Sequence, residues 1–396
     1  LNIKTSLTTK YNNTNMNVIK TMSKQRFLFT FIFLGLLVRI LFIPLPGFNI
    51  DVNDWFAWST RLNHFNFAQF YSKDIFTDYT PGYLYILSLL GFLKNLLVLP
   101  DNFFYLLLKI PPIISEIIIG LLVYKQIRKH SSEKIAIFSL SAVLFNPVLI
   151  FNSSIWGQID GILTLLMLIT IISLNKNSLI FTSIFFGLAL LIKPQALALI
   201  PLLIIFLASH FKFSSLFKMI APGFLIIFIL TFPFFPNQTL INLAQHIANT
   251  ANEYPYTSIN AYNLWGIVGF WIQDSNLWNG LSYQTWGYIL LSSYWIIIGY
   301  FYFKKKLSVY TLATLATLGF FFLPTRVHER YLYPALVFLI LITAYLKSKL
   351  LLVLTGILSL LHFLNLYYVY VYYNELYLKL PKILYNPILY NFLDSN

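Results

Sequence analysis

The sequence contains no cysteine, and only 10% of its 396 residues are charged. The absence of cysteine excludes a disulfide framework, a thiolate nucleophile and a cysteine-based metal or iron–sulfur site. The shortage of charge excludes a soluble domain of this length, because such a domain needs many more charged side chains to cover its surface. With 58% hydrophobic residues, 18% aromatic residues and a mean hydropathy of +0.72, the composition is that of a polytopic membrane protein.

The sequence also lacks a Gly-rich phosphate loop, a Rossmann-like alternation of strands and helices, and any long polar segment. A soluble domain that binds nucleotide sugars is therefore not predicted. Acidic residues are few, 13 against 27 basic ones, and the formal net charge is +14. In a membrane protein, the excess of basic residues bears first on how the chain is oriented in the membrane. We therefore predict no nucleic-acid partner from the positive charge.

Apolar stretches of about the length needed to cross ~30 Å of hydrocarbon predict an all-α bundle of about eleven membrane-spanning helices. These stretches are 27–44, 103–124, 135–152, 160–174, 179–192, 196–208, 218–235, 286–303, 308–323, 332–346 and 349–371. A further apolar stretch, 81–99, contains Lys94. If it crossed the membrane, every later loop would break the positive-inside rule, so we predict a juxtamembrane or re-entrant helix there.

This arrangement gathers the basic segments on one side, which the positive-inside rule assigns to the cytoplasm. Those segments are 1–26, 125–134, 176, 212–218, 304–306 and 347–349. All acidic residues except Glu116 and Glu133 then lie at or beyond the opposite, outer face. Because acidic residues contribute little to orientation, their segregation indicates a site at that face.

The domain organisation follows from the same pattern. Residues 1–24 are polar and rich in Asn and Thr, and we predict a disordered cytoplasmic N-terminus. Residues 25–396 are predicted to form a single transmembrane domain with two outer loops, 45–102 and 236–285. The second loop alternates aromatic with Asn, Ser and Gln side chains, which suits a lid that stacks on sugars. The alternative is an interfacial helix that only connects two spans.

Charged and aromatic residues form four clusters at the outer face. They are the segment from Asp51 to Tyr85, the segment 145–166 with its WGQIDG turn (156–161), the segment 191–201 that begins with the LIKPQ turn (191–195), and the LPTRVHERYLYP turn (323–334). Carboxylates that face Lys, Arg and His suit the transfer of a sugar from an anionic lipid phosphate to a hydroxyl group. One carboxylate deprotonates the acceptor, while the cations stabilise the departing phosphate. A donor that arrives through the bilayer also explains why no nucleotide-sugar domain is present.

Each cluster also has a purely structural interpretation. Asp160 would serve as a helix N-cap, and Lys193 would extend its ammonium to the interface beside a helix-breaking proline. The aromatic residues of the first loop would form an interfacial belt. A solvated loop is the alternative for residues 326–330, where four charged or imidazole-bearing side chains in five residues favour function.

The order of these motifs resembles that of the GT-C glycosyltransferases, which use polyprenyl-phosphate sugars. The sequence is most similar to the branch with the dolichyl-phosphate-glucose-dependent glucosyltransferases of N-glycan assembly and bacterial relatives of the mannosyltransferase type. As in that branch, Asp51 precedes Trp58 by seven positions. Three family motifs have counterparts in this sequence: DYPP corresponds to DYTP (78–81), ANFW to AYNLW (261–265) with one residue inserted, and VHEK to VHER (327–330). WGQIDG replaces the eukaryotic HFQYNG type, so Asp160 has no acidic counterpart there.

The resemblance implies a GT-C-type bundle and an inverting transfer of a hexose, mannose or glucose, to a glycan or lipid-linked acceptor at the outer or luminal face. The general base then falls to Asp51, with Asp54 as the second candidate. The candidates for the donor phosphate are His328 and Arg330, supported by Arg326 and Lys193, since arginine suits bidentate phosphate contact. Acceptor or sugar contacts are assigned to Asp160, Asp78, Tyr79, Trp58 and Trp265. A divalent metal is possible, and no other cofactor is predicted.

The abundance of Ile, Asn, Lys and Tyr is typical of an AT-rich genome and favours a bacterium. The protein would then lie in the plasma membrane with its site facing outward, whereas a eukaryotic relative would lie in the endoplasmic reticulum membrane. The rival interpretation is a transporter or flippase of a lipid-linked saccharide, with Arg39, Lys109 and Glu116 as intramembrane charges. Transporters place their key polar residues near mid-membrane, often within inverted repeats. The polar residues here cluster at one face without a convincing repeat, which favours the enzyme.

Overall fold

Long apolar helices form most of the chain, because in a bilayer the backbone must satisfy its own hydrogen bonds. The computed structural model describes residues 26–72, 75–210, 212–305 and 307–394. The predicted disordered N-terminus, 1–24, lies outside the described residues. Among the described residues, six helices are long and apolar enough to cross a membrane, and four more apolar helices have 10 to 17 residues. The all-α polytopic class is therefore confirmed, while the number of eleven spans stays a prediction.

The first half contains a helix over residues 26–42, α2 (Asn49–His64), η1 (Phe67–Gln69), α3 (Pro81–Leu96), α4 (Asp101–Leu108), α5 (Ile110–His130), α6 (Glu133–Leu144), α7 (Pro147–Ile150), η2 (Phe151–Trp156), α8 (Asp160–Asn175) and α9 (Leu179–Ile192). The second half contains η3 (Pro194–Leu199), α10 (Ile200–Ser209), α11 (Phe213–Thr231), α12 (Thr239–Glu253), η4 (Leu264–Ile267), α13 (Tyr283–Lys305), α14 (Val309–Phe322), η5 (Glu329–Leu332), α15 (Tyr333–Leu346), α16 (Lys349–Glu375) and α17 (Pro387–Asp394). The described residues also form four two-residue strands: β1 (Ser258–Ile259), β2 (Leu277–Trp278), β3 (Leu281–Ser282) and β4 (Val327–His328).

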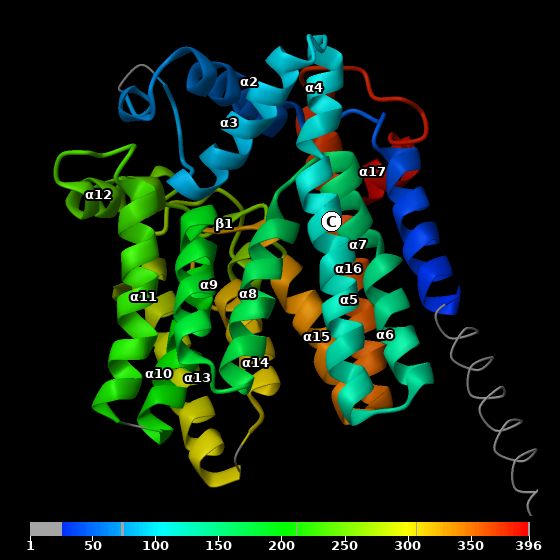
Figure 1. Cartoon of the computed structure of the whole chain (residues 1–396). Helices are drawn as coiled ribbons and strands as arrows, with labels where there is room; N and C mark the ends of the chain where they lie inside the picture. Colours follow the sequence, from blue (N-terminus) through cyan, green and yellow to red (C-terminus); the bar gives the residue numbers. More distant parts are fainter. Residues whose placement is uncertain (1–25, 73–74, 211, 306, 395–396) are drawn as a thin grey trace, which may run out of the picture.

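The two ends of the bundle differ in what they carry. Figure 1 shows α2 and α3 beyond one end of the bundle, with α12 beside them, so α3 does not run alongside the long helices. This position agrees with the predicted juxtamembrane helix at 81–99. The end of α5 and the start of α6, which carry basic residues, lie at the opposite end, as do the end of α10 and the start of α11. We call these the acidic end and the basic end.

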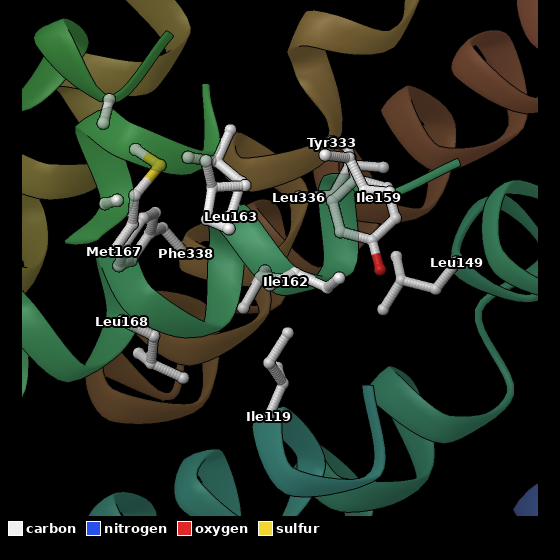
Figure 2. Packing of buried hydrophobic residues seen from close by; sticks show 14 of the residues in the cluster. Ile119, Leu149, Ile159, Ile162, Leu163, Met167, Leu168, Tyr333, Leu336 and Phe338 are labelled. Atoms are coloured by element: carbon white, nitrogen blue, oxygen red, sulfur yellow. The ribbon is translucent and has the colours of Figure 1, made fainter. Parts of the chain in front are cut away.

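The hydrophobic core lies around α8, which packs between α5, α9 and α15. Figure 2 shows its side chains Leu163, Met167 and Leu168 among residues of α5 and α15. Leu163 and Met167 are fully buried, as is Phe338 of α15. Because α8 is surrounded by other helices, its first turn, which begins at Asp160, is held firmly in the middle of the acidic end.

Two breaks in the helices leave polar backbone at the acidic end. The π-helical turn η2 ends at Gly157, whose φ of +89° lies in the left-handed region that favours glycine. The helix α9 ends at Lys193, because Pro194 cannot donate the next backbone hydrogen bond. These breaks place the WGQIDG and LIKPQ turns side by side, as the ion pair between Asp160 and Lys193 shows.

The second outer loop is folded against the LPTRVHERYLYP turn (323–334), which we call the late turn. β1 pairs in parallel with β4, so that Ser258 lies opposite Val327 and Ile259 opposite His328. β2 and β3 form an antiparallel hairpin further along the same loop. The loop begins with the amphipathic helix α12 on the outside of the bundle (Figure 1). The chain segment 254–285 therefore forms one wall of the region around His328.

Candidate active site

The DYTPG segment is fixed to the end of α9. The Thr80 hydroxyl donates a hydrogen bond to the Leu191 carbonyl at 2.7 Å. A Cβ added to Gly82 would lie only 2.4 Å from the same carbonyl oxygen, so the backbone of α3 approaches α9 closely here. This packing requires glycine and brings Asp78 and Tyr79 to the end of the bundle where Lys193 emerges.

The start of α2 is held by the WGQIDG turn. The Phe48 ring stacks on Trp156 with centroids 4.4 Å apart, and the Phe48 amide donates to the Trp156 carbonyl at 2.9 Å. The Trp156 indole N–H and the Gln158 amide both donate to Asp51 Oδ2, at 2.8 and 2.7 Å. Hydrogen bonds from two neutral donors fix the direction of the Asp51 carboxylate.

Gln158 links the first loop to the LIKPQ turn. Its side-chain oxygen accepts hydrogen bonds from the Tyr79 hydroxyl and the Lys193 ammonium, both at 3.1 Å, and from the Ile159 amide at 2.8 Å. Its amide nitrogen meanwhile donates to Asp51. Both ends of the fully buried Gln158 side chain are therefore satisfied, and Asp51 and Lys193 are held in a fixed relation.

Asp160 neutralises Lys193 beneath the site. Its Oδ1 lies 2.7 Å from the Lys193 ammonium, and its Oδ2 accepts a hydrogen bond from Asn152 at 3.0 Å. Asp160 is fully buried, and Lys193 is 8% exposed. A lysine ammonium has three donor positions. Since Gln158 and Asp160 take two of them, one remains for a ligand.

The late turn adds a second cation. Arg330 donates to Glu329 at 2.7 Å, and its guanidinium lies 5.5 Å from the centroid of the Trp156 ring. Its Nε is buried and has no partner among the described residues. The His328 ring lies between Tyr254 and Tyr331, with centroids 5.1 and 5.3 Å away. A buried donor nitrogen without a partner is rare and points to a ligand that supplies the acceptor.

Two adjoining cavities open at the acidic end. The residues that line both are Asp78, Tyr79, Tyr254, His328 and Arg330. The larger cavity measures about 400 Å³ and adds Lys193 to this set. The smaller measures about 140 Å³ and adds Asp51, Asp54 and Trp58. We call them the cationic cavity and the acidic cavity.

Burial shapes the charges of this site. It raises the pKa of Asp54 to about 6, with a further contribution from the nearby Asp51 carboxylate. Burial and the same neighbour raise the pKa of Asp78 to about 6 as well. Burial, Arg330 and Lys193 hold the pKa of His328 well below its usual range, so this imidazole is neutral at pH 7.

The raised pKa of Asp54 predicts a pH dependence of stability. An unfolded aspartate releases its proton near pH ~4, whereas the folded protein keeps it up to about pH 6. The folded state thus binds more protons in between, and the free energy of unfolding falls as the pH rises through this window. We expect Asp54→Asn to reduce this slope and to raise the thermal unfolding midpoint above pH 6. Asp101→Asn, which removes an exposed carboxylate paired with Lys94, is the control, and an equal change in both variants would contradict the assignment.

Arg326 has partners that hold the second outer loop in place. Its guanidinium contacts the buried Asp274 at 2.7 and 3.3 Å, and its Nη1 donates to Asn252 at 2.8 Å. The Thr325 hydroxyl also donates to Asp274 at 2.9 Å. Arg326 lines the cationic cavity, but its guanidinium group already binds the Asp274 carboxylate. Its role is therefore to position the second outer loop.

We therefore expect Arg326→Gln to loosen residues 254–285. The change leaves the buried Asp274 carboxylate without its cation, and we expect a loss of about 1–3 kcal/mol in stability. Limited proteolysis should cut this segment faster in the variant than in the wild type. Arg61→Gln, which removes an arginine that binds backbone carbonyls of the first loop, is the matched control. Unchanged cleavage within 254–285 would show that Arg326 does not hold the loop.

The structure brings most of the predicted site residues together, but not all. Trp265 is buried away from both cavities, where its indole donates to the Leu323 carbonyl at 2.7 Å. Asp160 lies one layer behind the cavities, against Lys193. Three residues that were not predicted take part: Gln158 and Trp156, which bind Asp51, and Tyr254, which lines both cavities. The only signal in the sequence for Gln158 was its place inside WGQIDG.

The described part of the chain offers no ready set of ligands for a metal ion. Among the described residues, no group of three or more His, Asp or Glu side chains is arranged to hold one. Asp51, Asp54 and Asp78 line one cavity, where burial and the charge of Asp51 raise the pKa values of Asp54 and Asp78.

The fold and site together define a class: an all-α polytopic membrane protein with a charged, two-chambered site at one end. Residues 99–236, about a third of the chain, match the family of dolichyl-phosphate-mannose-protein mannosyltransferases. A relative named GPI mannosyltransferase 1, from Candida albicans, is 29% identical over 121 residues, which cover 29% of this chain and 30% of the relative's length. These matches confirm the predicted resemblance to GT-C polyprenyl-phosphate-sugar glycosyltransferases. The family match includes Gln158, Asp160 and Lys193.

Proposed function

We propose that this protein is an integral-membrane glycosyltransferase that moves a hexose from a polyprenyl-phosphate donor to a hydroxyl group of a glycan or lipid-linked acceptor. The observation that carries the proposal is the convergence of Lys193 and Arg330 on a cavity that adjoins a second cavity lined by Asp51. The matched family and the matched relative are both named as mannosyltransferases, and this favours mannose over glucose.

The cationic cavity suits the donor. Lys193 has a free donor position and Arg330 a buried Nε without a partner, so together they offer hydrogen bonds and positive charge to a phosphate. The neutral His328 adds a donor or acceptor without further charge. Leu197, Leu291 and Phe320 line another part of this cavity. A phosphate joined to an isoprenoid chain needs such a combination of cationic and apolar walls.

The acidic cavity suits the acceptor. Asp51 Oδ2 is held by Trp156 and Gln158, while its Oδ1 accepts no hydrogen bond from the described residues. We assign to it the proton of the acceptor hydroxyl. Trp58 and Tyr79 supply aromatic faces of the kind that stack on sugars.

The reaction follows from the two cavities. The acceptor oxygen loses its proton to Asp51 and forms a bond to the anomeric carbon of the donor sugar. The bond from that carbon to the phosphate oxygen breaks, and Lys193 and Arg330 stabilise the charge on the departing polyprenyl phosphate. The acceptor approaches from one cavity and the phosphate leaves into the other, so the configuration at the anomeric carbon is inverted.

The membrane orientation follows from the basic end. The positive-inside rule places the basic turns in the cytoplasm, which puts the site at the outer face of a plasma membrane or the luminal face of the endoplasmic reticulum. A lipid-linked donor reaches either face within the bilayer.

The test is a transfer assay with the purified full chain in liposomes. We expect transfer of radiolabel from polyprenyl-phosphate mannose to extracted envelope or membrane acceptors, less transfer from polyprenyl-phosphate glucose, and none from GDP-mannose. Transfer from GDP-mannose alone would contradict the lipid donor. Movement of a lipid-linked saccharide across the liposome, without any transfer, would instead establish the flippase.

A further inference from the structure

A further cavity, an open groove, lies away from the active site, between α6 and α16 and along α15. It measures about 640 Å³ and has mainly apolar walls that include Phe138, Ile340 and Leu352. Figure 1 shows these three helices in the same half of the bundle. The groove runs toward the basic end, where Lys347, Ser348 and Lys349 line it.

We propose that this groove binds an anionic phospholipid from the leaflet at the basic end, with the headgroup at Lys347 and Lys349. The inference does not rest on the transfer reaction. It rests on the length of the groove, on the state of its polar groups and on its charge.

The length of the groove matches one leaflet. Along α16 the lining extends from Lys349 to Leu360, and eleven helical steps of ~1.5 Å cover about 17 Å. Half of the ~30 Å hydrocarbon core is about 15 Å. An acyl chain whose headgroup lies at the lysines therefore ends close to the middle of the membrane, where the groove also ends.

The polar side chains inside the groove form hydrogen bonds within the protein and need no polar ligand. Asn146 donates to Ser359 at 3.1 Å, and the hydroxyls of Thr343 and Thr355 are bonded to each other at 3.1 Å. The Ser139 hydroxyl donates to a backbone carbonyl of its own helix. These polar side chains are satisfied within the protein, so the remaining surface suits hydrocarbon.

The mouth of the groove carries uncompensated positive charge. Lys347 and Lys349 are exposed and have no ion pair among the described residues. None of the described residues that line the groove is acidic. Basic residues next to a membrane surface attract anionic lipids by about 1 kcal/mol each. A helix from a second copy of this chain would fill the apolar walls but would leave this charge unpaired.

Two pairs of variants test the proposal. Lys347→Gln with Lys349→Gln removes the charge, and Lys212→Gln with Lys218→Gln removes the same charge from another exposed site at the basic end. Gly356→Leu fills the groove, because a Cβ at Gly356 meets nothing within 4 Å. Gly356→Ala is its control, since it changes the backbone preference in the same way without filling the space.

The measurement is native mass spectrometry of the full chain after exchange into mixed phosphatidylglycerol and phosphatidylcholine. We expect the wild type to retain phosphatidylglycerol in preference, with a loss of that preference on the order of tenfold in the Lys347/Lys349 variant and none in the Lys212/Lys218 variant. Gly356→Leu should lose both lipids, and Gly356→Ala neither. Equal losses in both lysine variants would overturn the proposal. Lipid retention unchanged by Gly356→Leu, with a dimer dissociated by the same change, would show that a second copy occupies the groove.

Discussion

Replacing Asp51 with asparagine should abolish sugar transfer while leaving donor binding intact. The amide cannot take the acceptor proton, and loss of a general base costs roughly 10²–10⁴-fold in rate. The replacement is nearly isosteric, and the oxygen of the amide can still accept the hydrogen bonds of Trp156 and Gln158. The measurement is kcat in the transfer assay, together with the Kd for the donor.

Asp54→Asn is the matched control, because Asp54 lines the same cavity one helical turn further along α2. We expect a smaller effect from it, since no partner in the described structure orients its carboxylate. If Asp54→Asn abolishes transfer and Asp51→Asn does not, the base is Asp54. If both variants keep wild-type rates, neither aspartate is the base.

Removing Arg39 should have the largest effect on stability. Arg39 pairs with Glu116 at 2.7 Å, and both side chains are fully buried. Tyr333 and Ser153 also donate to the Glu116 carboxylate, at 2.6 and 2.8 Å. Arg39→Met leaves a buried carboxylate without its cation, which costs about 3–5 kcal/mol. Thermal unfolding in detergent, followed by tryptophan fluorescence, should show a clearly lower midpoint.

The double variant Arg39→Met with Glu116→Leu separates the lost pair from the lost packing. Replacing both partners by apolar residues leaves no charge unpaired, and we expect it to recover much of the stability. An equal loss in the single and double variants would show that packing of Arg39, rather than its charge, holds the first helix against α5.

The fold class could be predicted from composition because long apolar runs have few alternatives in a chain with so little charge. The helices predicted at 160–174 and 179–192 were placed to within one residue, since turns mark their ends, whereas the helix predicted at 349–371 continues to Glu375. The exact number of spans could not be predicted in the same way. Several helices are shorter than a membrane crossing, and whether such a helix spans depends on its neighbours.

The candidate site was predictable in its parts but not in its connections. The charges of WGQIDG and LIKPQ stood out because such residues are costly in an apolar chain. That Gln158 joins Asp51 to Lys193 could not be predicted, because the three residues come from separate segments of the sequence and meet only in the folded protein. The structural partners of Arg326 and the burial of Trp265 likewise depend on how segment 254–285 folds back on the late turn.

The most direct test of the account is a structure of the Asp51→Asn variant with polyprenyl-phosphate mannose bound. We predict that the phosphate lies between Lys193 and Arg330 in the cationic cavity, with the Arg330 Nε donating to it. The anomeric carbon should face residue 51 across the shared wall. A phosphate bound elsewhere, with Lys193 and Arg330 still paired only to Asp160 and Glu329, would contradict the assignment of both cavities.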